Sequence, residues 1–317
     1  MLRYALARVL ATIPVVVLTS IIVFALMRML PGDPITVLIG QAHVDVGEQQ
    51  LAQMRKDLGL DQPIPIQYLH WVKRAVSGDF GRSVQSRQPV WDVLRPRILP
   101  TVQIGLTAWL LALVVGIPIG IATATAQNTW KDWAGSVGAL IGAAMPYFLV
   151  GGLLIYFVAL KWRLLPASGF VSPFVDFGAS VRTTILPALT LALGLAAVIT
   201  RQTRASFIDV MQRAFIKTAR AKGLTEQRVV SRHAFKNAML PVVTILGIQL
   251  ATVFSGAVIT ETIFAVPGIG RLLVDSILSR DYPVVQAAVL FISLMVVAAN
   301  LAVDILYGLL DPRIREA

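Results

Sequence analysis

The sequence contains no cysteine among its 317 residues, and only 14% of its residues are charged. The absence of cysteine excludes a disulfide scaffold, thiolate metal sites and cysteine nucleophiles. Soluble globular domains carry about 25% charged residues, so the shortage of charge indicates the class of protein. Hydrophobic residues make up 56% of the chain, and together these values favour a membrane protein over a soluble one.

Motifs that would supply energy or catalysis are also missing. There is no G-x-x-x-x-G-K-[ST] pattern to cradle a nucleotide phosphate, and neither H-E-x-x-H nor G-x-S-x-G occurs. Ion-coupled carriers usually place a charged residue near the middle of a span, and this chain has none there. A polytopic enzyme and a self-sufficient secondary carrier are therefore the weaker alternatives. We expect the chain to bind no cofactor and no metal.

Six long stretches contain no Asp, Glu, Lys or Arg, and each is long enough to cross a bilayer as one helix. They cover residues 9–27, 98–130, 133–160, 183–200, 237–260 and 282–303. Their length and number predict an all-α, polytopic membrane protein with six transmembrane helices. The first stretch could instead be a signal peptide, but no small-residue cleavage site follows it, so we interpret it as a retained span.

Basic residues concentrate between the fourth and fifth stretches. Residues 201–236 hold nine Lys or Arg and two acids, Asp209 and Glu226. The positive-inside bias places this loop and both termini in the cytoplasm, and the segment from about 30 to 97 outside. The net charge of +11 is thereby explained by cytoplasmic loops in contact with membrane lipid, and we expect no nucleic acid partner.

The basic loop has its own helical pattern. Apolar residues recur at helical spacing over 205–222, which predicts one amphipathic helix that ends at Gly223. Thr225 is a plausible N-cap for a second helix, with Leu224 and Val229 as a hydrophobic staple. Two interpretations stay open: a rigid element that transmits force from a partner, or a basic helix lying on anionic lipid.

The outer segment is also predicted to be structured. Leu51, Met54 and Leu58 indicate a short helix, and Tyr68 and Trp71 belong to a second. The stretch 78–81, Gly-Asp-Phe-Gly, predicts a turn.

Several motifs, in order along nearly the whole chain, resemble the dipeptide/oligopeptide branch of ABC importer permeases. The Thr-Ala-Arg-Ala-Lys-Gly stretch 218–223 and the later Leu-Pro at 240–241 are similar to the EAA loop of that family, although Ala-Arg-Ala stands where Glu-Ala-Ala is usual. Further matches are 30–34 (Leu-Pro-Gly-Asp-Pro), 261–264 with 267–270, 280–283 and 311–315. The long first outer loop is most similar to that of the dipeptide permease members.

The resemblance implies a type I ABC importer fold in the bacterial cytoplasmic membrane. It implies a second homologous permease, two cytoplasmic P-loop ATPases that use ATP and Mg, and an external solute-binding protein. It divides the chain into an N-terminal helix with an outer loop (1–96), the transmembrane domain (97–308) and a cytoplasmic tail (309–317). Dipeptides or short peptides are the expected substrate. Nickel, glutathione and longer oligopeptides are alternatives.

Three groups of site residues follow, and none of them is catalytic. The resemblance implies that the EAA loop couples to an ATPase through Thr218, Ala219, Arg220, Ala221, Lys222, Gly223 and Leu224. Polar residues within a span are candidates for the substrate path, although helix-packing hydrogen bonds are the better explanation for any one of them: Gln249, Thr252 and Ser255. Candidates for an external gate or for docking the binding protein are Glu261, Phe264, Pro267, Gly268 and Gly270.

Overall fold

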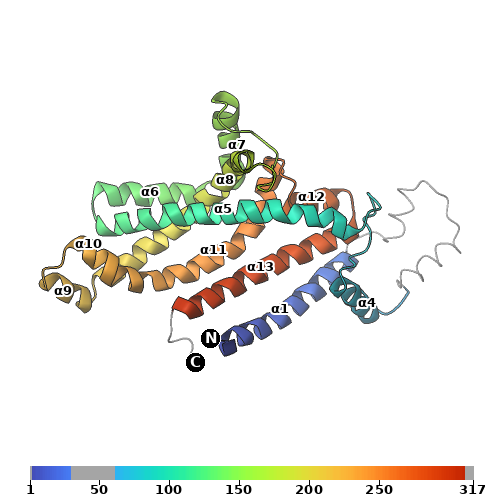
Figure 1. Ribbon diagram of the computed structural model, residues 1–317, viewed down its shortest axis with the longest axis horizontal. Helices are drawn as coiled ribbons and strands as arrows, with labels where there is room; N and C mark the ends of the chain where they lie inside the picture. The colour runs from blue at the N-terminus through green and yellow to red at the C-terminus, as the bar shows by residue number, and fades with distance from the viewer. Residues whose placement is uncertain (1, 30–60, 311–317) are drawn as a thin grey trace.

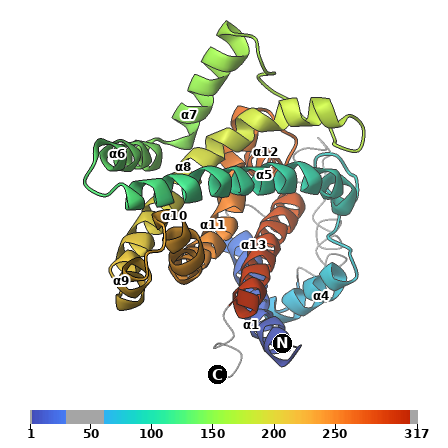
Figure 2. The same ribbon diagram turned by 60° about the vertical axis from the view of Figure 1, so that its left-hand side comes forward.

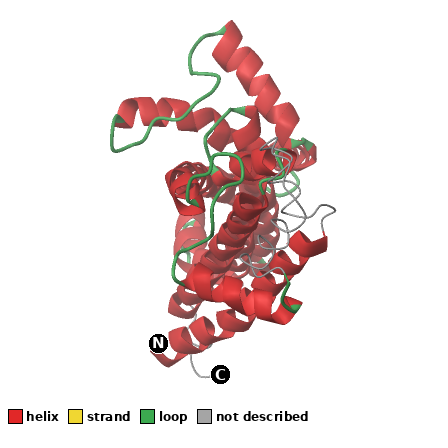
Figure 3. Ribbon diagram, turned by 90° about the vertical axis from the view of Figure 1, so that its right-hand side faces the viewer, coloured by secondary structure: helices red, strands yellow, loops and turns green. Residues whose placement is uncertain are grey.

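The computed structural model describes residues 2–29 and 61–310, and this part of the chain is almost entirely helical (Figures 1 and 3). The helices are α1 (Leu2–Met29), α4 (Ile64–Val76), α5 (Val90–Thr125), α6 (Trp130–Ala144), α7 (Tyr147–Leu154), η1 (Ile155–Lys161), α8 (Phe177–Met211), α9 (Ala214–Ala221), α10 (Glu226–Arg228), η2 (Val229–Ala234), α11 (Phe235–Ile263), α12 (Ile269–Leu278) and α13 (Tyr282–Leu310). The predicted outer helix around residues 51–58 and the motifs at 30–34 and 311–315 lie outside the described residues.

Five helices are long and apolar enough to span a membrane, and they lie within α1, α5, α8, α10–α11 and α13. A sixth span exists if α6 and the α7–η1 rod are counted together, although they bend by 102°. The sequence predicted an uninterrupted helix over 133–160, so the bend corrects that expectation. Pro146 lacks an N–H and disfavours helical backbone at the residue before it, and Met145 is accordingly extended (φ −75°, ψ 124°).

The long helices run between two ends of the molecule (Figure 1). One end, called here the α9 end, carries α9 and α10, and the start of α1 and the end of α13 lie on the same side of the bundle. The other, the α12 end, carries α12 and α4. Figure 2 shows the α7–η1 rod projecting away from the bundle.

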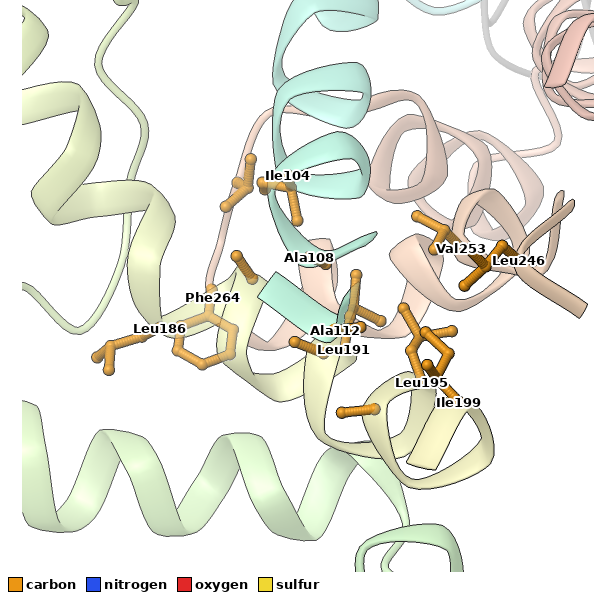
Figure 4. Close-up of a cluster of buried hydrophobic side chains, with 14 of the residues drawn as sticks. Ile104, Ala108, Ala112, Leu186, Leu191, Leu195, Ile199, Leu246, Val253 and Phe264 are labelled. Atoms are coloured by element: carbon orange, nitrogen blue, oxygen red, sulfur yellow. The ribbon is translucent and has the colours of Figure 1, made fainter. Parts of the chain in front are cut away.

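Small residues allow α5 and α8 to pack closely, as is usual for membrane helices. A Cβ on Gly120 would lie 2.5 Å from the Cβ of Thr203 and 2.8 Å from the carbonyl oxygen of Thr200. Apolar side chains of α5, α8 and α11 converge into the main core (Figure 4). The Trp109 indole donates a hydrogen bond to the carbonyl oxygen of Leu246 (3.0 Å), which also ties α5 to α11.

Candidate functional site

The α9 end is built from two helices where the sequence predicted one. The helix over 205–222 was expected to be continuous, but α8 ends at Met211, Arg213 is extended, and α9 begins at Ala214. The break folds α9 back onto the bundle, so that Ile216 and Ala219 become buried. Both pack in a cluster with Phe207 and with residues that follow the turn. A continuous helix would carry these two apolar side chains away from the cluster.

The turn after α9 has the predicted form. Gly223 has a φ of +76°, and its N–H donates to the carbonyl oxygen of Arg220 (2.9 Å). The Leu224 N–H donates back to Ala219 (3.4 Å), so the turn satisfies carbonyl groups at the end of α9. Glycine is suited to this backbone because side chains with a Cβ resist it. Leu224 packs against the Phe207 cluster beside Val229, as the predicted hydrophobic staple requires.

The predicted coupling residues divide into an inner and an outer group. Ala219 is buried and packs within its own chain, whereas the resemblance implied that its short side chain packs against an ATPase. Arg220 forms a solvent-exposed ion pair with Glu226 (2.5 Å). The outer group is exposed and consists of Thr218, Ala221, Lys222 and Gly223. These four residues form an exposed surface at the end of α9, called here the α9 surface, in which Lys222 is the basic residue.

Beside this surface lies a cleft of about 600 Å³ between α8, the end of α5 and the segment after α9. Its lining includes the aliphatic residues Ile121, Ile208 and Val230 and the charged pair Arg220 and Glu226. The cleft separates part of the basic loop from the bundle.

A second ion pair, which the sequence did not predict, joins α8 to α6 near the α9 end. The Arg204 guanidinium donates two hydrogen bonds to the Asp132 carboxylate (2.6 and 2.8 Å), which joins α8 to α6. Asp132 also accepts from the Asn128 N–H (3.0 Å) and the Ser136 hydroxyl (3.3 Å). The two charges lie 72 positions apart, so the only sequence signal was an acid beside an apolar stretch.

At the α12 end, Glu261 is fully buried and caps the start of α12. One carboxylate oxygen accepts the Thr101 hydroxyl (2.5 Å), and the other accepts the Arg271 N–H (3.0 Å). The Thr101 oxygen in turn accepts the Ile269 N–H (2.9 Å). Backbone N–H groups at a helix start have no partner within the helix, and a carboxylate also interacts favourably with the helix dipole.

Two glycines of the same motif leave room for that carboxylate. A Cβ on Gly268 would lie 2.1 Å from the carboxyl carbon of Glu261, and one on Gly270 would lie 2.5 Å from the Cα of Val258. Phe264 is buried in the main core, and Pro267 is exposed. The structure thus gives four of the five predicted gate or docking residues an internal role, and the docking function stays a prediction.

The motif at 280–283 also holds a buried carboxylate that accepts hydrogen bonds from within the chain. The buried Asp281 carboxylate accepts hydrogen bonds from the Ser83 hydroxyl and from the backbone N–H groups of Val84 (3.0 Å) and Gln85 (3.4 Å). This fastens the loop before α5 to the start of α13. Sequence alone showed the motif but could not show its partners, which lie about 197 positions away.

The candidate path residues on α11 face different ways. Gln249 is 9% exposed and turns into the bundle, whereas Thr252 and Ser255 are exposed. The Thr252 hydroxyl donates to the carbonyl oxygen of Gln249 (2.9 Å). The exposed face of α11 carries hydroxyl and aliphatic side chains: Thr244, Ile248, Thr252, Ser255 and Ile259.

This fold defines an all-helical, polytopic membrane protein. Residues 116–316 match the family described as "Binding-protein-dependent transport system inner membrane component", and residues 1–105 match its N-terminal counterpart. The chain belongs to this family, as the permease of a dipeptide/oligopeptide-type ABC importer, which is a multi-pass inner membrane protein. It works in a complex with ATPase subunits and is not itself an enzyme.

Two similar permeases match nearly the whole chain, and one solved structure matches most of it. The dipeptide transport system permease protein DppB of Escherichia coli K12 is 41% identical over 100% of this chain and 99% of its own length. The glutathione transport system permease protein GsiC of Salmonella choleraesuis is 42% identical over 99% of each chain. A chain of the inward facing MetNI methionine ABC transporter shares the fold, with a TM-score of 0.59, 15% identity, and coverage of 69% of this chain and 96% of that chain.

Proposed function

We propose that this chain forms one half of a path that carries short peptides across the membrane, and that the α9 surface couples the path to ATP hydrolysis. The observation that carries the proposal is the α9 surface. Ile216 and Ala219 pack α9 against the bundle, while Ala221, Lys222 and Gly223 stay exposed on the side away from it. A small, rigid, basic helix is suited to fit a groove on an ATPase and to transmit its movement into α8 and α11.

In this proposal the α9 end and both termini are cytoplasmic, in line with the concentration of Lys and Arg at residues 201–236. The two ATPases bind the ATP and Mg. A homologous permease completes the path, and an external binding protein delivers peptide to the α12 end. Residues 1–96, 97–308 and 309–317 act as the outer-loop region, the transmembrane domain and the cytoplasmic tail.

The substrate class rests on the exposed face of α11. Between Lys236 and Glu261 the helix has no charged residue, and from Thr244 to Ile259 the side chains it exposes are hydroxyl or aliphatic. Such a surface offers hydrogen bonds to a peptide backbone without selecting one kind of charged side chain. Thr252 and Ser255 are the residues we place on the path. Gln249, which points inward, supports the packing of the helix.

The function is tested by uptake of a labelled dipeptide into vesicles that contain the complete transporter, with glutathione and a nickel chelate as competitors. We expect ATP-dependent dipeptide uptake that glutathione inhibits weakly and nickel does not inhibit. Glutathione is the second candidate because GsiC is as similar to the chain as DppB. Uptake of glutathione or nickel without dipeptide would contradict the proposed substrate, and uptake by the isolated permease on an ion gradient would contradict ATP coupling.

A further inference from the structure

The helix α4 packs against α1 at a depth where α1 still belongs to the membrane. Tyr68 of α4 shares a hydrogen bond with Ser20 of α1 (2.8 Å), and both Tyr68 and Trp71 contact the Phe24 ring. The apolar span of α1 ends at Leu26. Ser20 lies six residues before it, or about 9 Å along the axis. The contact therefore lies inside the apolar span rather than beyond it.

The direction of α4 agrees with this position. Figure 1 shows α4 crossing the C-terminal end of α1 rather than running on beside it, and Figure 2 shows it leaving the bundle to one side. A helix that crosses a spanning helix near its end lies along the membrane surface. Tyr68 and Trp71 are the residue types that concentrate at that level.

The side chains of α4 form three sectors. Tyr68 and Trp71 face α1. A second sector is apolar and exposed, with Leu69 at 63% and Val76 at 83%. At 100° per residue, the third sector, which holds His70 and Arg74, lies opposite the midpoint of the other two. Water on that third side leaves the apolar sector facing the bilayer.

We propose that α4 is an interfacial helix that lies in the boundary between lipid headgroups and acyl chains, with Leu69 and Val76 inserted into lipid. The occupant of this surface is lipid because α4 contacts α1 at Ser20 and Phe24, inside the apolar span of α1. On the same side of α1, the apolar side chains of Val17 and Ile21 are 46% and 43% exposed. Lys73 is exposed beside the apolar sector, where its ammonium group can reach a lipid phosphate while its stem lies on the apolar boundary.

The polar sector is held in place from the aqueous side. Arg74 donates to the Asp79 carboxylate (2.8 Å), which also accepts the Gly81 N–H (2.9 Å). The hydrogen bond from Arg74 keeps the pKa of Asp79 below its ordinary value, so the pair persists at neutral pH. Gly78 and Gly81, with φ of +82° and +85°, form the predicted turn that directs the chain from α4 back to α5. Together these contacts fix which side of α4 faces the membrane.

The chain lacks cysteine, so single cysteines can carry a nitroxide label without background. The complete transporter is reconstituted into phosphatidylethanolamine–phosphatidylglycerol vesicles with a label at Leu69→Cys, Val76→Cys, His70→Cys or Leu18→Cys. Collision with oxygen, which concentrates in lipid, is compared with collision with a water-soluble nickel chelate. Leu18 is the lipid reference and His70 the water reference, and both positions are exposed.

We expect the oxygen-to-nickel ratio at positions 69 and 76 to exceed that at position 70 severalfold and to approach that at position 18. A ratio at both positions equal to that at position 70 would overturn the proposal, because the sector would then face water. Protection of both positions from both reagents would also overturn it, because a protein surface would then cover the sector. Two independent positions guard against a local effect of one label.

Discussion

The two ends of the molecule use motif residues in opposite ways. At the α12 end, Glu261 and Asp281 are buried and their carboxylates accept backbone and hydroxyl hydrogen bonds from within the chain. At the α9 end, Ala221 and Lys222 are exposed. A motif that is recognisable in the sequence can therefore be buried in the chain's own packing, or stay exposed, as we propose for contact with a partner. Burial and hydrogen bonding distinguish the two cases.

Backbone glycines show the same contrast. Gly268 lies against a buried carboxylate, and any Cβ there would overlap it. Gly223 has nothing within 4 Å of an added Cβ, and only its positive φ resists substitution. We expect changes at the α12 end to damage folding, and changes on the α9 surface to damage coupling in a folded protein.

The largest effect is expected for Gly268→Val. The added carbons would overlap the Glu261 carboxylate, so either α12 or the carboxylate must move and the capping hydrogen bonds are lost. Such a combination of overpacking and an unsatisfied buried charge exceeds about 4 kcal/mol of destabilisation. The yield of folded permease in the membrane, measured by fluorescence size-exclusion chromatography, should fall nearly to background. Wild-type yield would show that the packing around Glu261 is not as described.

A smaller loss is expected for Asp132→Asn. The change leaves the Arg204 guanidinium, 30% exposed, without its counter-ion, and we expect about 2 kcal/mol of destabilisation because water still reaches part of the pair. Thermal unfolding in detergent measures it. The matched control is Asp209→Asn, whose pair with Arg213 is exposed at both side chains and should contribute less than about 1 kcal/mol. Equal shifts for the two variants would refute the distinction.

The smallest effect on stability, with a large effect on transport, is expected for Gly223→Val. A positive φ costs a residue with a Cβ roughly 1–2 kcal/mol, so the protein should still assemble with its ATPases while peptide-stimulated ATP hydrolysis is lost. Gly223→Asn is the control, since asparagine tolerates this backbone better and should retain more coupling. Normal transport by Gly223→Val in an assembled complex would exclude this turn from coupling.

Much of the fold follows from the sequence because the distribution of charge is a direct consequence of the bilayer. Five of the six predicted spans are single helices in the structure, and the third corresponds to the bent pair of α6 and the α7–η1 rod. The predicted helix containing Tyr68 and Trp71 and the predicted turn at Gly223 are also present. The bend at Pro146 was missed because the stretches were counted by charge alone. The break before α9 was missed because it depends on burying Ile216, which periodicity along one helix cannot show.

The sites were harder to predict, because their partners lie far away in the sequence. Glu261 was predicted at an outer surface, yet it is buried between Thr101 and the start of α12. The sequence could not show this contact, because Thr101 lies 160 positions before Glu261. Ala219 looked like a contact residue because it is small, but small residues serve internal packing equally well. A sequence motif shows which residues matter together and leaves open which way they face.

The central claim is that the α9 surface docks on an ATPase, and a photo-cross-linking amino acid at Ala221 tests it directly. The position is exposed and lies on the opposite side of α9 from Ala219. In the complete transporter, irradiation should join the permease to an ATPase subunit in a product that mass spectrometry identifies. Cross-links only to lipid, or to the external binding protein, would contradict the account.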